Sequence, residues 1–185
     1  MTSMVSICNR ALSKIGDEIT ILSLEDSSKP ARYCKMLYPE TRDMVLRSYP
    51  WRFALKRYVL APMAEAPVFG FAKQFALPVN CLRVWRTEEN IPYQIEGKAL
   101  LADADVFRFI GIQRVEDPTL FDPMFVEAFA LKLASELALP LTASVSLKEA
   151  LYKEYQVFVQ QARTASAMEG CQDSYVQKGW LESRW

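Results

Sequence analysis

The sequence contains no histidine among its 185 residues, and this absence excludes several kinds of active site. Histidine is the commonest general base and the commonest metal ligand in proteins. A catalytic triad of serine, histidine and aspartate and a cysteine–histidine nucleophile pair are therefore impossible within one chain. The iron site built from two histidines and a carboxylate, and the zinc site of an H-E-x-x-H helix, are excluded for the same reason.

Net charge and long apolar runs are also lacking. The 22 basic and 22 acidic side chains give a formal net charge of zero, which argues against a protein that coats nucleic acid through bulk electrostatics. No uncharged apolar run reaches the roughly 18 residues that a membrane-spanning helix needs, so we expect no membrane partner. The chain reaches Arg10 before any long apolar stretch, so we expect no signal peptide. We expect a cytosolic origin because the cysteines show no disulfide spacing.

Cysteine is sparse and shows no paired spacing. The four cysteines lie far apart without a C-x-x-C motif, and a chain of this length does not need disulfides to fold. We therefore expect reduced, mostly buried thiols. They are Cys8, Cys34, Cys81 and Cys171.

Apolar residues make up 51% of the chain, enough for a sizeable core, and their spacing predicts helices near the N-terminus. The first helix is expected at about 4–15, with Ser3 as its N-cap and Gly16 as a left-handed end residue. A second helix is expected to begin at the cap Ser28. Because proline cannot donate a backbone hydrogen bond, we expect a kink or a break at Pro39.

Helical spacing returns in the C-terminal third of the chain. Asp122 is a predicted N-cap, and the apolar stripe that follows includes Phe129 and Leu133, which we expect to be buried against the first and last helices. Pro140 is predicted to end this helix. The S-x-x-E pattern at Ser146 is typical of a capping box and predicts the start of a last helix.

Between the helical segments the pattern changes to short runs rich in β-forming residues. Residues 68–114 predict four or five antiparallel strands, with a tight hairpin turn at Glu96-Gly97-Lys98. The predicted class is α+β, an antiparallel helical bundle with an inserted antiparallel β module and an extended C-terminal arm. The predicted boundaries are 1–60 and 115–170 for the bundle, 61–114 for the β module and 171–185 for the arm.

Basic charge is concentrated in residues 29–57, which carry eight basic side chains against Glu40 and Asp43. Such a segment can bind phosphates, with Trp51 and Phe53 as stacking groups, or acids on a neighbouring subunit. We favour a solvated helix face whose charges pair with a neighbouring subunit. The residues assigned to this basic face are Arg47, Arg52, Lys56 and Arg57.

The last fifteen residues, 171–185, show neither helical spacing nor strand alternation, yet they are rich in aromatic residues. A disordered tail is normally poor in tryptophan, and tryptophan is an enriched interface anchor. The arm either folds back onto its own bundle or reaches a partner, and we favour the partner. The residues assigned to this contact are Tyr175, Trp180, Leu181, Arg184 and Trp185.

Three pairs of neighbouring carboxylates beside the predicted strands are candidates for acid–base chemistry. Two nearby carboxylates can act as acid and base when their environments separate their pKa values. These pairs lie in predicted turns, where acids are common for solubility, and no P-loop, G-x-G-x-x-G, S-x-x-K or G-x-S-x-G motif accompanies them. We therefore expect no enzyme, no metal and no cofactor. The pairs are Glu88-Glu89, Asp103/Asp105 and Glu116-Asp117.

Five sequence segments in fixed order resemble the head-to-tail adaptor proteins of short-tailed bacteriophages, the tail tubular protein A family. The match depends on the order and spacing of all five segments and covers nearly the whole chain. The segments are ICNRALSKIG (7–16), RDMVLRSYPWRFALKR (42–57), FALPVNCLRV (75–84), YQIEGKALLAD (93–103) and FDPMFVEAFALKLASELALPLT (121–142).

This resemblance implies a structural protein of the virion at the head–tail junction, made in the cytoplasm of a bacterial host. It implies a homo-oligomeric ring, most often of twelve copies, beneath the portal protein, with a C-terminal extension that contacts the portal. It also implies a platform for the tail nozzle protein and a channel through which DNA passes without sequence-specific binding.

Two other functions remain open from the sequence. The first is a nucleic-acid-binding regulatory protein that uses residues 29–57, and the second is a hydrolase that uses Asp103 and Asp105. A regulator would form a small oligomer, whereas an adaptor would form a large ring or a monomer that assembles on its portal. Replacing both aspartates by asparagine would abolish a hydrolase and only perturb an adaptor.

Overall fold

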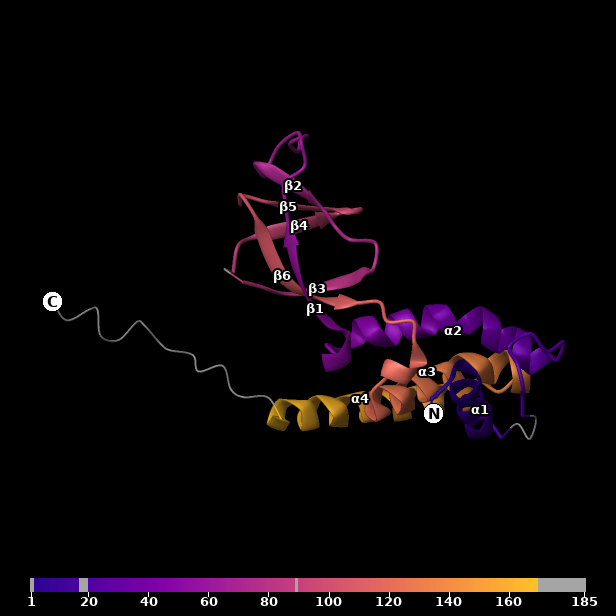
Figure 1. Ribbon diagram of the computed structural model, residues 1–185. Helices are drawn as coiled ribbons and strands as arrows, with labels where there is room; N and C mark the ends of the chain where they lie inside the picture. Colours follow the sequence, from indigo (N-terminus) through magenta and orange to yellow (C-terminus); the bar gives the residue numbers. More distant parts are fainter. Residues whose placement is uncertain (1, 17–19, 89, 170–185) are drawn as a thin grey trace.

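Helices from both ends of the chain form one body, and the strands between them form a β module that stands on it (Figure 1). The computed structural model describes residues 2–16, 20–88 and 90–169. Within these ranges it contains four α-helices and two antiparallel sheets of three strands each, which confirms the predicted α+β class. The predicted arm, 171–185, lies outside the described residues, and so does Cys171.

The other three helices pack around α3, which contacts each of them. Helices α2 and α4 lie on either side of α3 and run opposite to it (Figure 1). Phe129 and Leu133 of α3 are fully buried in the shared core, as predicted. The bounds are Met4–Lys14 for α1, Lys29–Ser48 for α2, Pro123–Thr142 for α3 and Val145–Glu169 for α4.

Polar side chains fix the start of α1 and the segment that follows it. The Ser3 hydroxyl accepts from the backbone N–H of Ser6 at 3.1 Å, and the Ser6 hydroxyl accepts from the backbone N–H of Ser3 at 2.8 Å. The side-chain amide of Asn9 on α1 holds the backbone of Ile21 through two hydrogen bonds. It donates to the Ile21 carbonyl at 2.9 Å and accepts from the Ile21 N–H at 3.0 Å. Gly16 has the predicted left-handed conformation, with φ at 78°.

Two helical prolines behave differently from the prediction. Helix α2 continues through Pro39 without a break, because Pro39 is exposed while Cys34, Tyr38 and Val45 hold the helix against the core. Pro140 does not end α3 either, since the helix continues through it to Thr142. The stop predicted at Pro140 was therefore wrong, and of the kink or break predicted at Pro39 the break does not occur.

The cap of α4 also differs from the prediction. Ala143 ends α3 in the left-handed conformation, with φ at 56°, and its N–H donates to the Leu139 carbonyl at 2.9 Å. This short connection places Ser144 before α4, and its hydroxyl accepts from the Leu147 N–H at 3.2 Å. Ser146, the predicted cap, already lies inside the helix.

The β module contains two sheets, with strand orders β1-β6-β3 and β2-β5-β4. The predicted boundary between residues 60 and 61 was wrong, because β1 pairs along its whole length with β6 and belongs to the module. Gly97 and Lys98 form the predicted tight turn between β4 and β5. The bounds are Leu55–Leu60, Lys73–Ala76, Cys81–Thr87, Tyr93–Glu96, Ala99–Ala102 and Phe107–Gln113 for β1 to β6.

A separate apolar core lies between the two sheets. Phe75 and Leu100 are completely buried in it, and Tyr58 stacks on Phe109 with ring centroids 4.9 Å apart. At the junction with the helices, Trp51 is buried and its indole N–H donates to the Val45 carbonyl at 3.0 Å. The module is therefore a packed unit that is seated on the end of α2.

The described cysteines form no disulfide, in agreement with the prediction. Cys8 and Cys34 are buried in the helical core, and Cys81 is partly buried on β3. A hydrogen bond with Cys34, reinforced by burial, raises the pKa of the Cys8 thiol far above its ordinary value. Such a thiol stays protonated, which fits a structural role in the core.

Tyr38 offers a stability prediction, because its buried hydroxyl finds no hydrogen-bond partner among the described residues. Its ring packs edge-on against Phe129, with centroids 4.8 Å apart, and phenylalanine would keep that contact. Tyr38→Phe removes this unsatisfied buried hydroxyl, so it should raise the free energy of unfolding by about 1 kcal/mol, as measured by urea denaturation at neutral pH.

The gain from Tyr38→Phe should grow at alkaline pH. Burial raises the pKa of Tyr38 well above its ordinary value, so the folded protein keeps the proton while the unfolded chain loses it near pH 10. The wild-type protein therefore loses stability as the pH rises above about 10, and the variant escapes this loss. At neutral pH Tyr155→Phe is the matched control, because the Tyr155 hydroxyl bonds Ser48 at 3.2 Å and its removal should not stabilise. Burial also raises the pKa of Tyr155, so the comparison between the two variants is made below about pH 9. A Tyr38→Phe protein no more stable than wild type would contradict the prediction.

Candidate interaction surfaces

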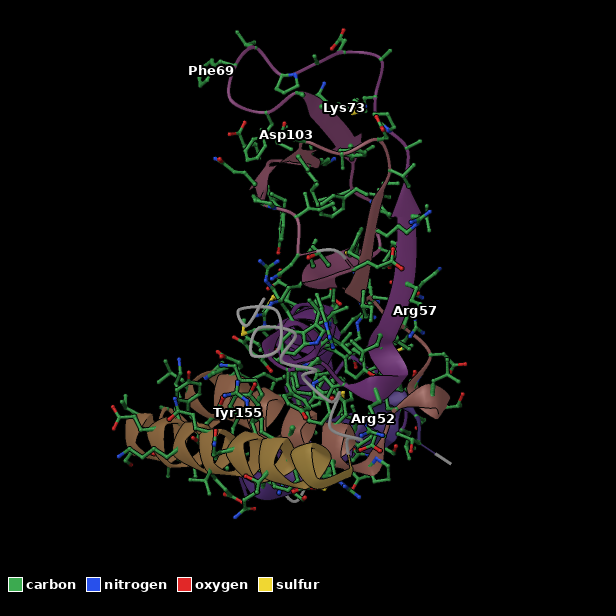
Figure 2. All side chains as sticks on the ribbon, turned by 90° about the vertical axis from the view of Figure 1, so that its left-hand side faces the viewer. Arg52, Arg57, Phe69, Lys73, Asp103 and Tyr155 are labelled. Carbon is green, nitrogen blue, oxygen red and sulfur yellow. The ribbon has the colours of Figure 1, made fainter. Side chains whose placement is uncertain are left out.

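The four residues of the predicted basic face are all exposed, but they do not form one surface. Arg47 lies in the last turn of α2, Arg52 lies in a short 3-10 helix, and Lys56 and Arg57 are consecutive on β1. Consecutive strand residues point to opposite faces of a sheet, so Lys56 and Arg57 cannot act together. Figure 2 shows Arg52 beside the helical body and Arg57 farther along β1.

The contacts of these four cations also differ. Arg47 donates to the Leu82 carbonyl at 2.7 Å and thereby helps to seat β3 on α2. The Lys56 ammonium group lies 5.6 Å from the centre of the Tyr58 ring. Arg52 and Arg57 form no ion pair with any residue in the described ranges. Arg52 and Arg57 therefore remain available to a partner.

Arg57 belongs to a groove on the outer face of the sheet β1-β6-β3, which we call the sheet groove. Its volume is about 460 Å³. Strand register places Arg57 and Arg86 on either side of Ile110, because both pair with that central residue of β6. The groove is lined by Arg57, Tyr58, Val59, Arg86, Thr87, Glu88, Arg108, Phe109 and Ile110.

The sheet groove combines positive charge with an apolar floor. Three of its lining residues are arginines and one is a glutamate. The Arg108 guanidinium lies 3.4 Å from the Glu88 carboxylate, and both side chains remain more than half exposed. Val59 is 67% exposed beside them, which leaves apolar surface in contact with water. Such a groove suits a ligand that is both apolar and negatively charged.

Sequence analysis missed Arg86 and Arg108 because they lie far from residues 29–57 along the chain. The alternation of Phe107, Arg108 and Phe109 marks Arg108 as an outward-facing strand residue. The pairing of β6 with both β1 and β3 is what gathers the arginines, and no local pattern specifies that strand order.

A second surface lies at the far end of the β module, in a loop that we call the apolar loop, 61–72. Figure 2 shows Phe69 on this loop, at the end of the module farthest from the helices and directed away from the strands. Phe69 is 86% exposed and Val68 is 98% exposed. The loop carries one charged residue, Glu65, among twelve. Contiguous exposed apolar surface of this kind marks an interaction site in soluble proteins.

The apolar loop is held at its base, where Lys73 and Asp103 lie beneath it (Figure 2). The Met63 N–H donates to the Gln74 carbonyl at 2.8 Å. The Ala72 N–H donates to the Asp103 carboxylate at 2.6 Å, and the Lys73 ammonium group donates to Asp105. That lysine lowers the pKa of the Asp105 carboxyl. The base is therefore fixed while the tip projects.

The carboxylate pairs proposed for hydrolysis have structural contacts wherever they are described. Asp103 and Asp105 anchor the apolar loop, as shown above. Asp117 caps the short helix Pro118–Leu120, and the N–H and hydroxyl of Thr119 lower the pKa of its carboxyl. Glu116 lies 3.7 Å from the Arg42 guanidinium. Glu89 lies outside the described residues. None of these arrangements favours the hydrolase hypothesis.

A second hollow lies between α2, α3 and α4 and has a volume of about 430 Å³. Its charged groups are engaged within the chain. The Lys132 ammonium group is 2.5 Å from Glu136 and lies 4.7 Å from the centre of the Tyr152 ring. The Tyr155 hydroxyl, which is labelled in Figure 2, bonds Ser48. This hollow is explained by helix packing and offers less free charge than the sheet groove.

Comparisons with known proteins add no relative. The sequence matches no family model, and it has no significant similarity to any curated protein. Among the described residues, no three acidic or cysteine side chains come together as a possible metal site. No described helix has both the length and the apolar character needed to cross a bilayer.

Proposed function

We propose that this chain is a ring-forming adaptor of a phage virion, located at the head–tail junction. It joins the portal protein to the tail nozzle protein and lines the channel through which DNA leaves the head. The proposal rests on the resemblance of five ordered sequence segments to the head-to-tail adaptors of short-tailed bacteriophages. One structural observation supports it best. The β module stands clear of the helices and exposes two different surfaces, a projecting apolar loop and a groove lined by arginines.

The mechanism in this proposal is geometric and has no catalytic step. Repeated contacts between two different surfaces of identical subunits close a ring when the rotation per subunit divides a full turn. Charge complementarity between those surfaces sets the register and discourages wrong pairings. The predicted portal contact through Tyr175, Trp180, Leu181, Arg184 and Trp185 stays a prediction, because these residues lie outside the described ranges.

The deciding experiment is a mass measurement of the protein alone and mixed with a portal ring. Twelve copies per particle are expected in the assembled state. A stable monomer or dimer under both conditions would contradict the proposal. A nanomolar, sequence-selective DNA complex at physiological salt would favour the regulatory protein instead, because a channel must let DNA slide and can bind phosphate only weakly.

Charge reversal at the basic face gives a more specific test. Because Arg52 has no ion-pair partner among the described residues and Lys56 is exposed, Arg52→Glu with Lys56→Glu should leave the fold intact and weaken ring formation about tenfold or more. Higher salt should also weaken ring formation by the wild-type protein, because it screens the charges across the interface. Lys98→Glu, in the exposed hairpin turn, is the matched control. Normal rings from the double variant at every salt concentration would exclude Arg52 and Lys56 from the interface.

A further inference from the structure

We propose that the apolar loop of one copy docks in the sheet groove of the next copy. This inference rests on the proposed ring and names the two surfaces that form its repeating contact. It starts from a complementarity within one chain, since the loop is apolar with acidic neighbours and the groove is apolar with basic neighbours.

The apolar parts of the two surfaces supply the attraction. Phe69 and Val68 project from the loop with almost no cover from their own chain. The groove offers Val59, which is 67% exposed, and Ile110, which is half-buried, across a volume of about 460 Å³. This space holds one aromatic and one aliphatic side chain with ease. Burying a phenylalanine together with its aliphatic neighbour is a typical anchor of a protein interface.

The charged parts of the two surfaces have opposite signs. Glu65 in the loop and Asp103 and Asp105 at its base are exposed, and Lys73 is their basic neighbour. Across the contact, Arg57 has no ion pair with a described residue, and the Arg108 side chain is 53% exposed. Opposite charges around an apolar centre favour this docking over contact between two loops or between two grooves.

The positions of the two surfaces make the contact heterologous. Figure 2 shows Phe69 at the far end of the module and Arg57 on β1 near the helices, so one copy presents both surfaces in different places. Within a single copy the loop does not reach its own groove, as the exposure of Phe69 shows. Each copy can therefore give its loop to one neighbour and accept a loop from another, which is the connectivity of a ring.

A mixing experiment with two variants of the full chain tests this contact. The loop variant is Val68→Ser with Phe69→Ser, and the groove variant is Arg57→Glu with Val59→Ser. Sedimentation velocity at about 200 µM should show wild-type particles larger than dimers, since weak contacts with Kd in the tens of micromolar are mostly formed there. Each variant alone should associate at least about tenfold more weakly than wild type.

The equimolar mixture of the two variants gives the distinguishing result. The loop variant keeps an intact groove, and the groove variant keeps an intact loop, so one contact can form between them. The other loop and the other groove are both substituted, so no second contact can form and the mixture should contain heterodimers and nothing larger. Val79→Ser is the matched control, since Val79 is 85% exposed elsewhere on the module, and it should assemble like wild type. Thermal melting of every variant should match wild type because the substituted side chains are exposed.

Several outcomes would overturn the inference. If wild type assembles and either variant assembles equally well, the loop–groove contact is wrong while the proposed ring stands. If wild type stays monomeric at this concentration and on a portal ring, both proposals are wrong. If wild type, but not the loop variant, cosediments with phosphatidylcholine vesicles, the loop binds lipid and the contact between copies is wrong.

Discussion

Replacing Phe129 by alanine should lower the free energy of unfolding by about 3–5 kcal/mol. Phe129 lies in the second turn of α3, is completely buried and contacts the rings of Tyr38, Phe121 and Phe125. Its removal takes a large apolar side chain out of the core and leaves a cavity that rigid neighbours cannot fill. Urea denaturation followed by tryptophan fluorescence measures the loss, because Trp51 lies in the same core.

Leu139→Ala provides the matched control for Phe129→Ala on the same helix. Leu139 is 43% exposed, so its truncation should cost less than about 1 kcal/mol. The two substitutions then separate core burial from helix propensity. A loss below about 1 kcal/mol for Phe129→Ala would contradict the placement of α3 at the centre of the helical body.

Replacing Asp43 by alanine should cost about 3 kcal/mol, because this carboxylate holds two arginines at the junction of the two parts. One carboxylate oxygen accepts from the Arg42 Nε at 2.9 Å, and the other accepts from the Arg114 Nε at 2.7 Å. The Arg42 side chain is only 9% exposed. Without Asp43, the Arg42 guanidinium keeps one ion-pair partner among the described residues, the carboxylate of Glu116 at 3.7 Å.

The expected cost of Asp43→Ala is mainly the cost of leaving a buried cation poorly compensated. Glu25→Ala is the matched control, since it removes the acid of an ion pair with Lys35 in which both side chains are more than half exposed. Exposed pairs contribute at most about 1 kcal/mol, so this control should change stability little. Equal losses for the two variants, measured by urea denaturation, would show that the junction cluster does not stabilise the fold.

Local signals in the sequence predicted most of the secondary structure. The caps at Ser3, Ser28 and Asp122 and the left-handed Gly16 act through neighbouring residues, so they can be read without knowing the fold. The five short runs in 68–114 each became a strand because their composition and turns agree over a few residues. These predictions hold because the physics that determines them is local.

The wrong predictions concern positions where tertiary contacts outweigh a local penalty. Pro39 removes one hydrogen bond from α2, but the buried side chains around it keep the helix whole. Residues 55–60 looked like a continuation of the basic segment, and only their pairing with β6 makes them a strand. In both cases the decisive partner lies far away in the sequence.

The candidate surfaces were predicted only in part for the same reason. Arg57 was identified from its own segment, whereas Arg86 and Arg108 join it through strand order. The exposure of Val68 and Phe69 depends on how the strands on either side of the loop are arranged in space. Composition shows that a loop is apolar, and only the fold shows that nothing covers it.

The entry and exit strands of the β module are direct neighbours, and this makes the module a self-contained insertion. The chain leaves the helices through β1 and returns through β6, with Leu55 opposite Ile112. The two crossing points are therefore one strand spacing apart, roughly 5 Å. A short turn could bridge that gap without moving α2 or α3. The module could therefore be shortened, enlarged or exchanged without disturbing the helices, so its sequence and shape can vary independently of the helical body.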